Sequence, residues 1–183
     1  FQLDDPEIAA IKDGASSITI GRANGTGGAT INAITFNDPV TIRSPSGGAI
    51  TVNGQITGAG NASVTLDGAG ATTTLNADIV TSGTDITISD NVLLGEATSI
   101  TLSTGAASAG NISVTGTING TAGGALENLT LTSGSGTTTI TGAIGNLDPL
   151  GTLTLQADNA GATGAVTLNG AVNVDTLTTF GRA

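Results

Sequence analysis

The stretch SITIGRANGTGGATINAITF, residues 17–36, contains the triplet Ile18-Thr19-Ile20, in which a threonine separates two aliphatic residues. Further triplets of this kind stand at 40–42, 50–52, 64–66, 86–88, 100–102, 129–131, 153–155 and 166–168. Successive side chains of an extended strand point to opposite sides, so the two aliphatic residues share one face and the threonine takes the other. Each triplet therefore predicts a short β-strand with one buried face.

The triplets recur at a regular interval along the chain. Their first residues lie 22 to 24 positions apart in two series: Ile18, Val40, Val64 and Ile86, and Leu129, Leu153 and Leu177. Between the strands stand Gly, Asn, Ser and Asp, which tolerate positive φ or hydrogen-bond to their own backbone and so turn the chain sharply. A period of this length is typical of solenoids, in which stacked coils bury a continuous core.

We therefore expect an all-β fold, a single-stranded parallel β-helix with about seven coils of about 22–24 residues in residues 15–183. A β-sandwich is the alternative, because it also consists of many short strands. A sandwich, however, gives no reason for so regular a repeat, so we favour the solenoid.

The first fourteen residues, FQLDDPEIAAIKDG, differ from the rest. Asp5 suits a helix cap, Pro6 the first helical position and Gly14 the end of a helix. We expect residues 1–14 to form a short capping helix that covers the first coil, because an uncovered coil exposes unpaired strand edges. A helix that binds a partner is the alternative.

The composition excludes several classes of function. The 183 residues contain no Cys, Met, Trp, Tyr or His, and four Lys and Arg stand against fourteen Asp and Glu, a formal charge of -10. Nucleic acids and anionic membrane surfaces are bound through many basic residues, and single-stranded bases also stack on aromatic side chains. No apolar run approaches the roughly 18 residues that span a bilayer. We expect neither a nucleic-acid partner nor membrane insertion.

Candidate catalytic carboxylates are present, but they stand in expected turns. Glycoside hydrolysis requires two carboxylates beside the bond, and the aspartates available are Asp67, Asp78, Asp85, Asp90, Asp148, Asp158 and Asp175. Most lie beside Gly, Asn or Thr, so we interpret them as solvated turn residues. A lyase requires a basic side chain, and Lys12 belongs to the expected cap, while nucleophilic triads lack His. We expect no enzyme and no catalytic residue.

No metal or cofactor site is expected either. Zinc lacks Cys and His ligands, and neither the EF-hand spacing nor a glycine-rich calcium nonapeptide occurs. The segment GRANGTGG, residues 21–28, lacks the Gly-Lys-Ser/Thr ending of a phosphate loop, and we interpret it as a turn. Glycosylation sequons occur by chance in such a chain and matter only in a eukaryotic secretory pathway: Asn24, Asn61, Asn111, Asn119 and Asn128.

Residues 13–68, DGASSITIGRANGTGGATINAITFNDPVTIRSPSGGAITVNGQITGAGNASVTLDG, resemble the β-strand repeat regions of large cyanobacterial surface proteins, which are related to filamentous-haemagglutinin-like adhesins. GAIGNLDPLGTLTL, residues 142–155, is similar to a recurring segment of such bacterial arrays. The resemblance implies a right-handed β-helix, export to the cell surface or medium, and further repeats in the same polypeptide, of which this chain is a fragment. It implies no catalytic residue.

We expect a structural function, a stalk or spacer of a secreted or cell-surface protein. The alternatives are a solenoid that binds a glycan or ice, or a subunit of a filament or surface layer. Ice-binding solenoids present rows of Thr-x-Thr, and only Thr130-x-Thr132 and Thr152-x-Thr154 fit when the triplets are aligned, so a regular array is not expected.

The last coil is expected to be open. Val172, Val174 and Leu177 would form an exposed apolar ring with unpaired strand edges, which can pair with another chain. We expect end-to-end self-association that strengthens with salt, because salt screens the charge of -10.

Overall fold

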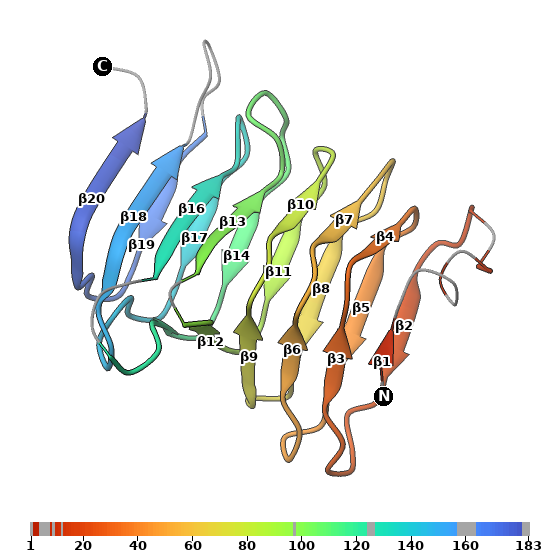
Figure 1. Ribbon diagram of the computed structural model, residues 1–183. Helices are drawn as coiled ribbons and strands as arrows, with labels where there is room; N and C mark the ends of the chain where they lie inside the picture. Colours follow the sequence, from red (N-terminus) through yellow and green to blue (C-terminus); the bar gives the residue numbers. More distant parts are fainter. Residues whose placement is uncertain are drawn as a thin grey trace.

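The computed structural model describes residues 2, 3, 8, 10, 11, 13–96, 98–123, 127–156 and 164–180. Within these ranges the chain is all-β, and its strands form three parallel sheets that run side by side along one solenoid (Figure 1). No helix in this part of the chain combines the length and the apolar character that crossing a membrane requires. The expected parallel β-helix is confirmed.

We call the three sheets A, B and C. Between residues 18 and 132 each coil contributes one strand to sheet B, then one to sheet A and then one to sheet C. Sheet B consists of β2 (Ile18–Gly21), β5 (Val40–Arg43), β8 (Val64–Asp67), β11 (Ile86–Ile88), β14 (Ile112–Val114), β17 (Thr138–Ile140) and β19 (Val166–Leu168). Sheet A consists of β1 (Gln2–Leu3), β3 (Ala29–Ile31), β6 (Ile50–Val52), β9 (Thr72–Leu75), β12 (Asn91–Leu94) and β15 (Ile118–Asn119). Sheet C consists of β4 (Ile34–Phe36), β7 (Ile56–Gly58), β10 (Ile79–Thr81), β13 (Ser99–Ser103), β16 (Asn128–Thr132), β18 (Leu150–Gln156) and β20 (Val174–Phe180).

The winding is right-handed. In Figure 1 the chain climbs the near side through β3 and β4 and descends the far side through β5, while successive coils advance toward the C-terminus at the left. The seven strands of sheet B delimit six full turns. The first turn runs from Ile18 to its register partner Val40, and the last runs from Thr138 to its partner Val166. The later turns are therefore longer than the sequence period of the first coils predicts.

The triplets place their side chains as expected. In β11 both Ile86 and Ile88 are 0% exposed, whereas Thr87 between them is half-exposed. Ile86 pairs in register with Val64 on one side and with Ile112 on the other, so the aliphatic side chains form a column. Such columns from all three sheets fill the interior, which supplies the hydrophobic stabilisation that no single coil provides alone.

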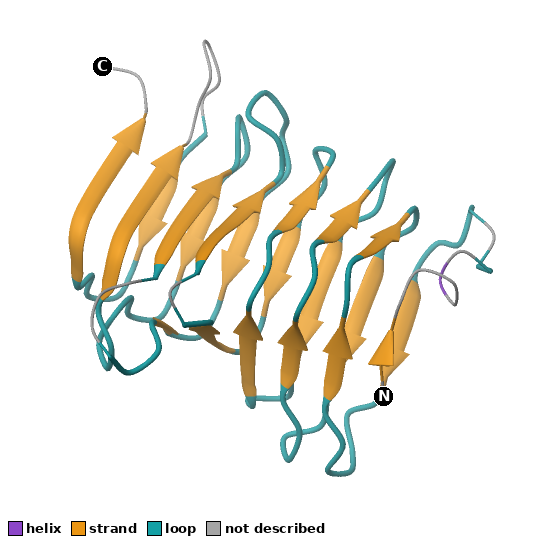
Figure 2. Ribbon diagram, in the orientation of Figure 1, coloured by secondary structure: helices purple, strands orange, loops and turns teal. Residues whose placement is uncertain are grey.

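The N-terminal cap contains a short strand that the sequence did not predict. Gln2 and Leu3 form β1, which pairs with β3 and extends sheet A by one strand (Figure 2). Ile8 is helical and only 7% exposed, so it contributes an apolar contact to the cap. Residues 1, 4–7, 9 and 12 lie outside the described part. The strand β1 precedes Pro6, the first position of the expected helix, and most of that helix lies outside the described residues.

The last described coil is open, as expected. Leu177 pairs in register with Leu153, which is 0% exposed, yet Leu177 itself is 52% exposed. Val172 is 37% exposed, and Val174 is half-buried. Strands β19 and β20 are the outermost members of sheets B and C, so the inner face of this coil lacks a following layer among the described residues.

Candidate functional site

Asp90 holds two coils together from a buried position. Its side chain is 1% exposed, and its Oδ2 accepts hydrogen bonds from Gly68 N at 2.6 Å and Thr73 Oγ1 at 2.9 Å. Its Oδ1 accepts a longer bond from Gly70 N at 3.3 Å. The interpretation of Asp90 as a solvated turn residue is therefore wrong, because three donors of the preceding coil replace water around the carboxylate.

Other aspartates also bridge neighbouring coils. Asp78 Oδ1 accepts a hydrogen bond from Thr101 N at 2.7 Å. The exposed Asp85 uses one oxygen, Oδ1, to accept bonds from Asn111 N at 2.7 Å and from Asn111 Nδ2 at 3.1 Å. Thr101 lies in β13 just before its paired register with β10 begins, and Asn111 just precedes β14. These carboxylates therefore accept backbone N–H groups that the neighbouring strand does not pair, so their role is structural.

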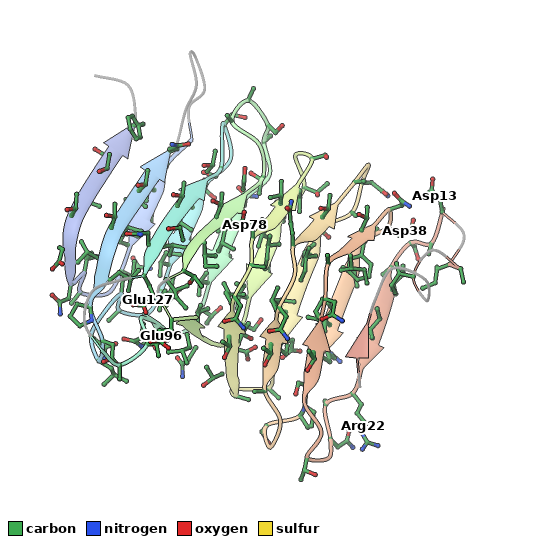
Figure 3. The ribbon with its side chains drawn as sticks, in the orientation of Figure 1. Asp13, Arg22, Asp38, Asp78, Glu96 and Glu127 are labelled. Atoms are coloured by element: carbon green, nitrogen blue, oxygen red, sulfur yellow. The ribbon has the colours of Figure 1, made fainter. Side chains whose placement is uncertain are left out.

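The acidic side chains do not gather at one place in the described part of the molecule. Figure 3 shows Asp38 near the N-terminal end and Glu127 toward the other end. Asp148 is partly exposed and Asp175 is exposed, whereas Asp158 lies outside the described residues. Within the described ranges no three Asp or Glu side chains gather in a way that could hold a metal ion.

The outer side of sheet C carries a surface that the sequence analysis did not expect. We define the hydroxyl face as the outward side chains of β13, β16, β18 and β20. Its central column is all threonine: Thr101, Thr130, Thr154 and Thr178. The column beside it carries three hydroxyls and one amide: Ser99, Asn128, Thr152 and Thr176. Only two rows of these two columns read Thr-x-Thr, Thr152-x-Thr154 and Thr176-x-Thr178, so the hydroxyl face is a threonine column with mixed polar neighbours rather than a regular Thr-x-Thr array.

Hydrogen bonds order the hydroxyl face along its edges. Asn128 Nδ2 donates to Ser99 Oγ at 3.1 Å, and Thr132 Oγ1 donates to Gln156 Oε1 at 3.1 Å. The threonine column could not be predicted from the triplets alone, because the triplets belong to different sheets. Thr19 and Thr87 lie in sheet B and Thr51 lies in sheet A, so only the triplets of sheet C share this surface.

The segment 21–28 is the expected turn between β2 and β3, and it borders a pocket. The pocket has a volume of about 440 Å³ and is lined by Gly21, Arg22, Gly27, Gly28, Arg43 and Pro45. Arg43 Nε lies 3.1 Å from Asp67 Oδ2, and the two side chains are 45% and 31% exposed. Two basic side chains from neighbouring coils, Arg22 and Arg43, therefore line the same pocket.

No protein-family model, curated protein or solved structure matches this chain. The resemblance to cyanobacterial surface repeats therefore remains a prediction from the sequence. What the geometry supplies is a continuous core, bridging carboxylates, an ordered hydroxyl face and one pocket with two arginines.

Proposed function

We propose that this chain is a structural spacer, a stalk segment of a secreted or cell-surface protein of the bacterial adhesin type. The observation that carries the proposal is an unbroken apolar column inside the solenoid: Ile42, Leu66, Ile88 and Val114 lie in one register column and are each 0% exposed. A column without gaps or polar interruptions makes a stiff rod. The bridging carboxylates support the same role, because they serve the stacking of coils rather than a reaction.

Further coils fit the open end. A layer stacked on β20 would cover Leu177 and the edge of sheet C, whether it came from the same polypeptide or from a second copy. The formal charge of -10 keeps the sides of such rods apart at low salt. These features favour growth along the axis over side-by-side packing.

The spacer function is tested by changing the number of coils. Deletion of residues 86–111 removes one register repeat, and duplication of the same residues adds one. The maximum dimension from small-angle X-ray scattering should fall or rise by about 4.8 Å, the strand spacing, with unchanged β-sheet circular dichroism. Deletion of residues 99–111, half a coil, is the control and should abolish folding, because every later strand would enter the wrong sheet. A length that does not follow the number of coils contradicts the proposal.

The hydroxyl face favours a second candidate function, binding to an ordered surface such as ice or a crystalline glycan. Thr154 lies in the middle of the face, so Thr154→Tyr would disturb it, whereas Thr65→Tyr on sheet B is the matched control. Thermal hysteresis and co-sedimentation with crystalline cellulose measure the two kinds of surface. Loss of either activity in Thr154→Tyr alone supports this candidate, and absence of both from the unaltered chain eliminates it.

A further inference from the structure

The pocket beside Arg22 lies between the first two coils, at the corner between sheets B and A. The turn after β2 forms one wall, and the end of β5 with Pro45 forms the other. The loop is anchored by Ser44, whose Oγ donates to Gly27 O at 3.4 Å. At Gly28 an ideal Cβ would lie 2.6 Å from Ala49 O, so only glycine allows this approach of the two coils. Backbone packing therefore fixes the walls.

The pocket concentrates the scarce positive charge of the chain. Four Lys and Arg occur in the whole sequence, and Arg22 and Arg43 both line this hollow. Asp67 compensates Arg43 through its Nε. Across the described ranges no carboxylate forms an ion pair with Arg22, whose side chain Figure 3 shows at the N-terminal end, on the loop below β3. Arg22, Arg43 and Asp67 together therefore carry one net positive charge at the pocket.

The other lining residues suit a ligand with a polar body. Gly21, Gly27 and Gly28 are exposed and carry no side chains, so a ligand can approach their backbone closely. Backbone groups both donate and accept hydrogen bonds, as sugar hydroxyls do. The volume of about 440 Å³ lies in the range of small-molecule sites and is far larger than an inorganic ion needs.

We propose that this pocket binds a sugar acid, an organic monocarboxylate of the size of a hexuronate, with its carboxylate on Arg22. Arginine matches a carboxylate with two parallel N–H donors, and one net positive charge matches a single negative charge. The ring then lies over the exposed glycines, within reach of Arg43. The inference goes beyond the spacer function and does not depend on it.

The test is a nuclear magnetic resonance titration of the folded chain with galacturonate, glucose and inorganic phosphate as separate probes. Galacturonate should shift the amide signals of Gly21, Gly27 and Gly28 in a saturable manner, and added salt should weaken the effect. Glucose has the ring without the charge, and phosphate has the charge without the ring. Both should bind more weakly than galacturonate by about tenfold, because each lacks one half of the interactions.

Four variants locate the site. Arg22→Gln should weaken galacturonate binding by roughly tenfold, whereas Thr167→Glu makes the same change of net charge at an exposed position of β19 and should leave binding unaltered. Asp67→Asn removes the compensating carboxylate from Arg43 and should tighten binding severalfold. An ideal Cβ on Gly27 meets no atom within 4 Å, so Gly27→Leu is tolerated and should abolish binding by filling the space.

Several results would overturn the assignment. They are the absence of saturable shifts with galacturonate, equal binding of glucose or phosphate, and unchanged binding in Arg22→Gln or Gly27→Leu. The thermal melting of each variant, measured alongside, shows whether a loss of binding reflects unfolding. If Arg22→Gln unfolds the chain, Arg22→Lys takes its place and should still bind more weakly, because an ammonium lacks the two parallel donors.

Discussion

Gly110 lies where two coils approach too closely for a side chain. An ideal Cβ there would stand 2.6 Å from Thr84 O, 2.8 Å from Thr84 C and 2.9 Å from Gly83 C, all backbone atoms that cannot rotate away. The residue is buried, and its φ lies outside the left-handed region, so backbone strain does not contribute to the effect of an alanine. Gly110→Ala therefore isolates the steric cost of separating two coils.

The magnitude follows from the distances. Ordinary carbon–oxygen contacts measure about 3.3–3.6 Å, so the corner must open by about 0.7–1 Å. Such a shift costs about 1–3 kcal/mol as overpacking. It also weakens two neighbouring bonds, Ile86 N to Asn111 O at 2.8 Å and Asn111 N to Asp85 Oδ1 at 2.7 Å, each worth about 0.5–1.5 kcal/mol. Alanine also restricts the unfolded chain, which stabilises the folded state by about 0.4–1 kcal/mol. The free energy of unfolding should therefore fall by about 2–4 kcal/mol in total.

Urea denaturation followed by circular dichroism measures this loss as a lower midpoint at an unchanged slope. Gly27→Ala is the matched control, because its Cβ meets no atom within 4 Å and its φ is not positive. The control should be neutral or slightly stabilising. Equal midpoints for the two variants would refute the close approach of the coils at Gly110.

Three further perturbations test the core, the bridges and the open end. Leu155→Asp buries a carboxylate in a column whose Leu155 is 7% exposed and should abolish cooperative melting, whereas Thr154→Ser on the outer face should change stability by less than about 0.5 kcal/mol. Asp90→Asn turns an amide toward three donors, and the free energy of unfolding should fall by about 2–4 kcal/mol in the urea assay. Sedimentation velocity between about 0.01 and 1 M salt, over which the Debye length falls from about 30 to 3 Å, should show self-association that rises with salt and that Val174→Pro removes; a monomer throughout would contradict it.

The sequence predicted the stacking of strands but not their distribution over three sheets. The inward and outward sides of each triplet could be predicted because alternation in a strand is a local property. The gap between Ile86 and Leu129 arises because the two series belong to different sheets: Ile86 begins a strand of sheet B, whereas Leu129 lies in a strand of sheet C. After Ile86, strands β14 and β17 of sheet B also depart from the triplet pattern. Ser113 takes the threonine position in β14, and β17 begins with Thr138, a buried residue whose Oγ1 donates to Ser133 Oγ at 3.0 Å. A strand that begins with a buried, hydrogen-bonded threonine does not show the aliphatic-Thr-aliphatic pattern, so the triplets do not predict it.

Other features depend on contacts between coils, which no local pattern specifies. The sequence predicts turns at both Asp90 and Asp175, yet Asp90 is buried among donors of the preceding coil, whereas Asp175 lies within strand β20 and is exposed. The pocket likewise joins Arg22 and Arg43, which are separated by one turn of the solenoid. Residues 21–28 form the turn that the sequence predicts. The opposite wall of the pocket, Arg43 and Pro45, could not be predicted because it depends on the pairing of β2 with β5.

The register of sheet B has a consequence for how the chain acquires its fold. Strand partners in this sheet always belong to adjacent turns, even in the widest pair, Thr138 with Val166, so each new coil finds its template in the coil just before it. Contacts of such short reach keep the entropy of loop closure small and allow folding to spread from any finished coil. A chain that emerges from a ribosome or a translocation pore in order, N-terminus first, can therefore complete each layer before the next arrives. Gain or loss of a whole coil by gene duplication or deletion leaves that sequence of events unchanged.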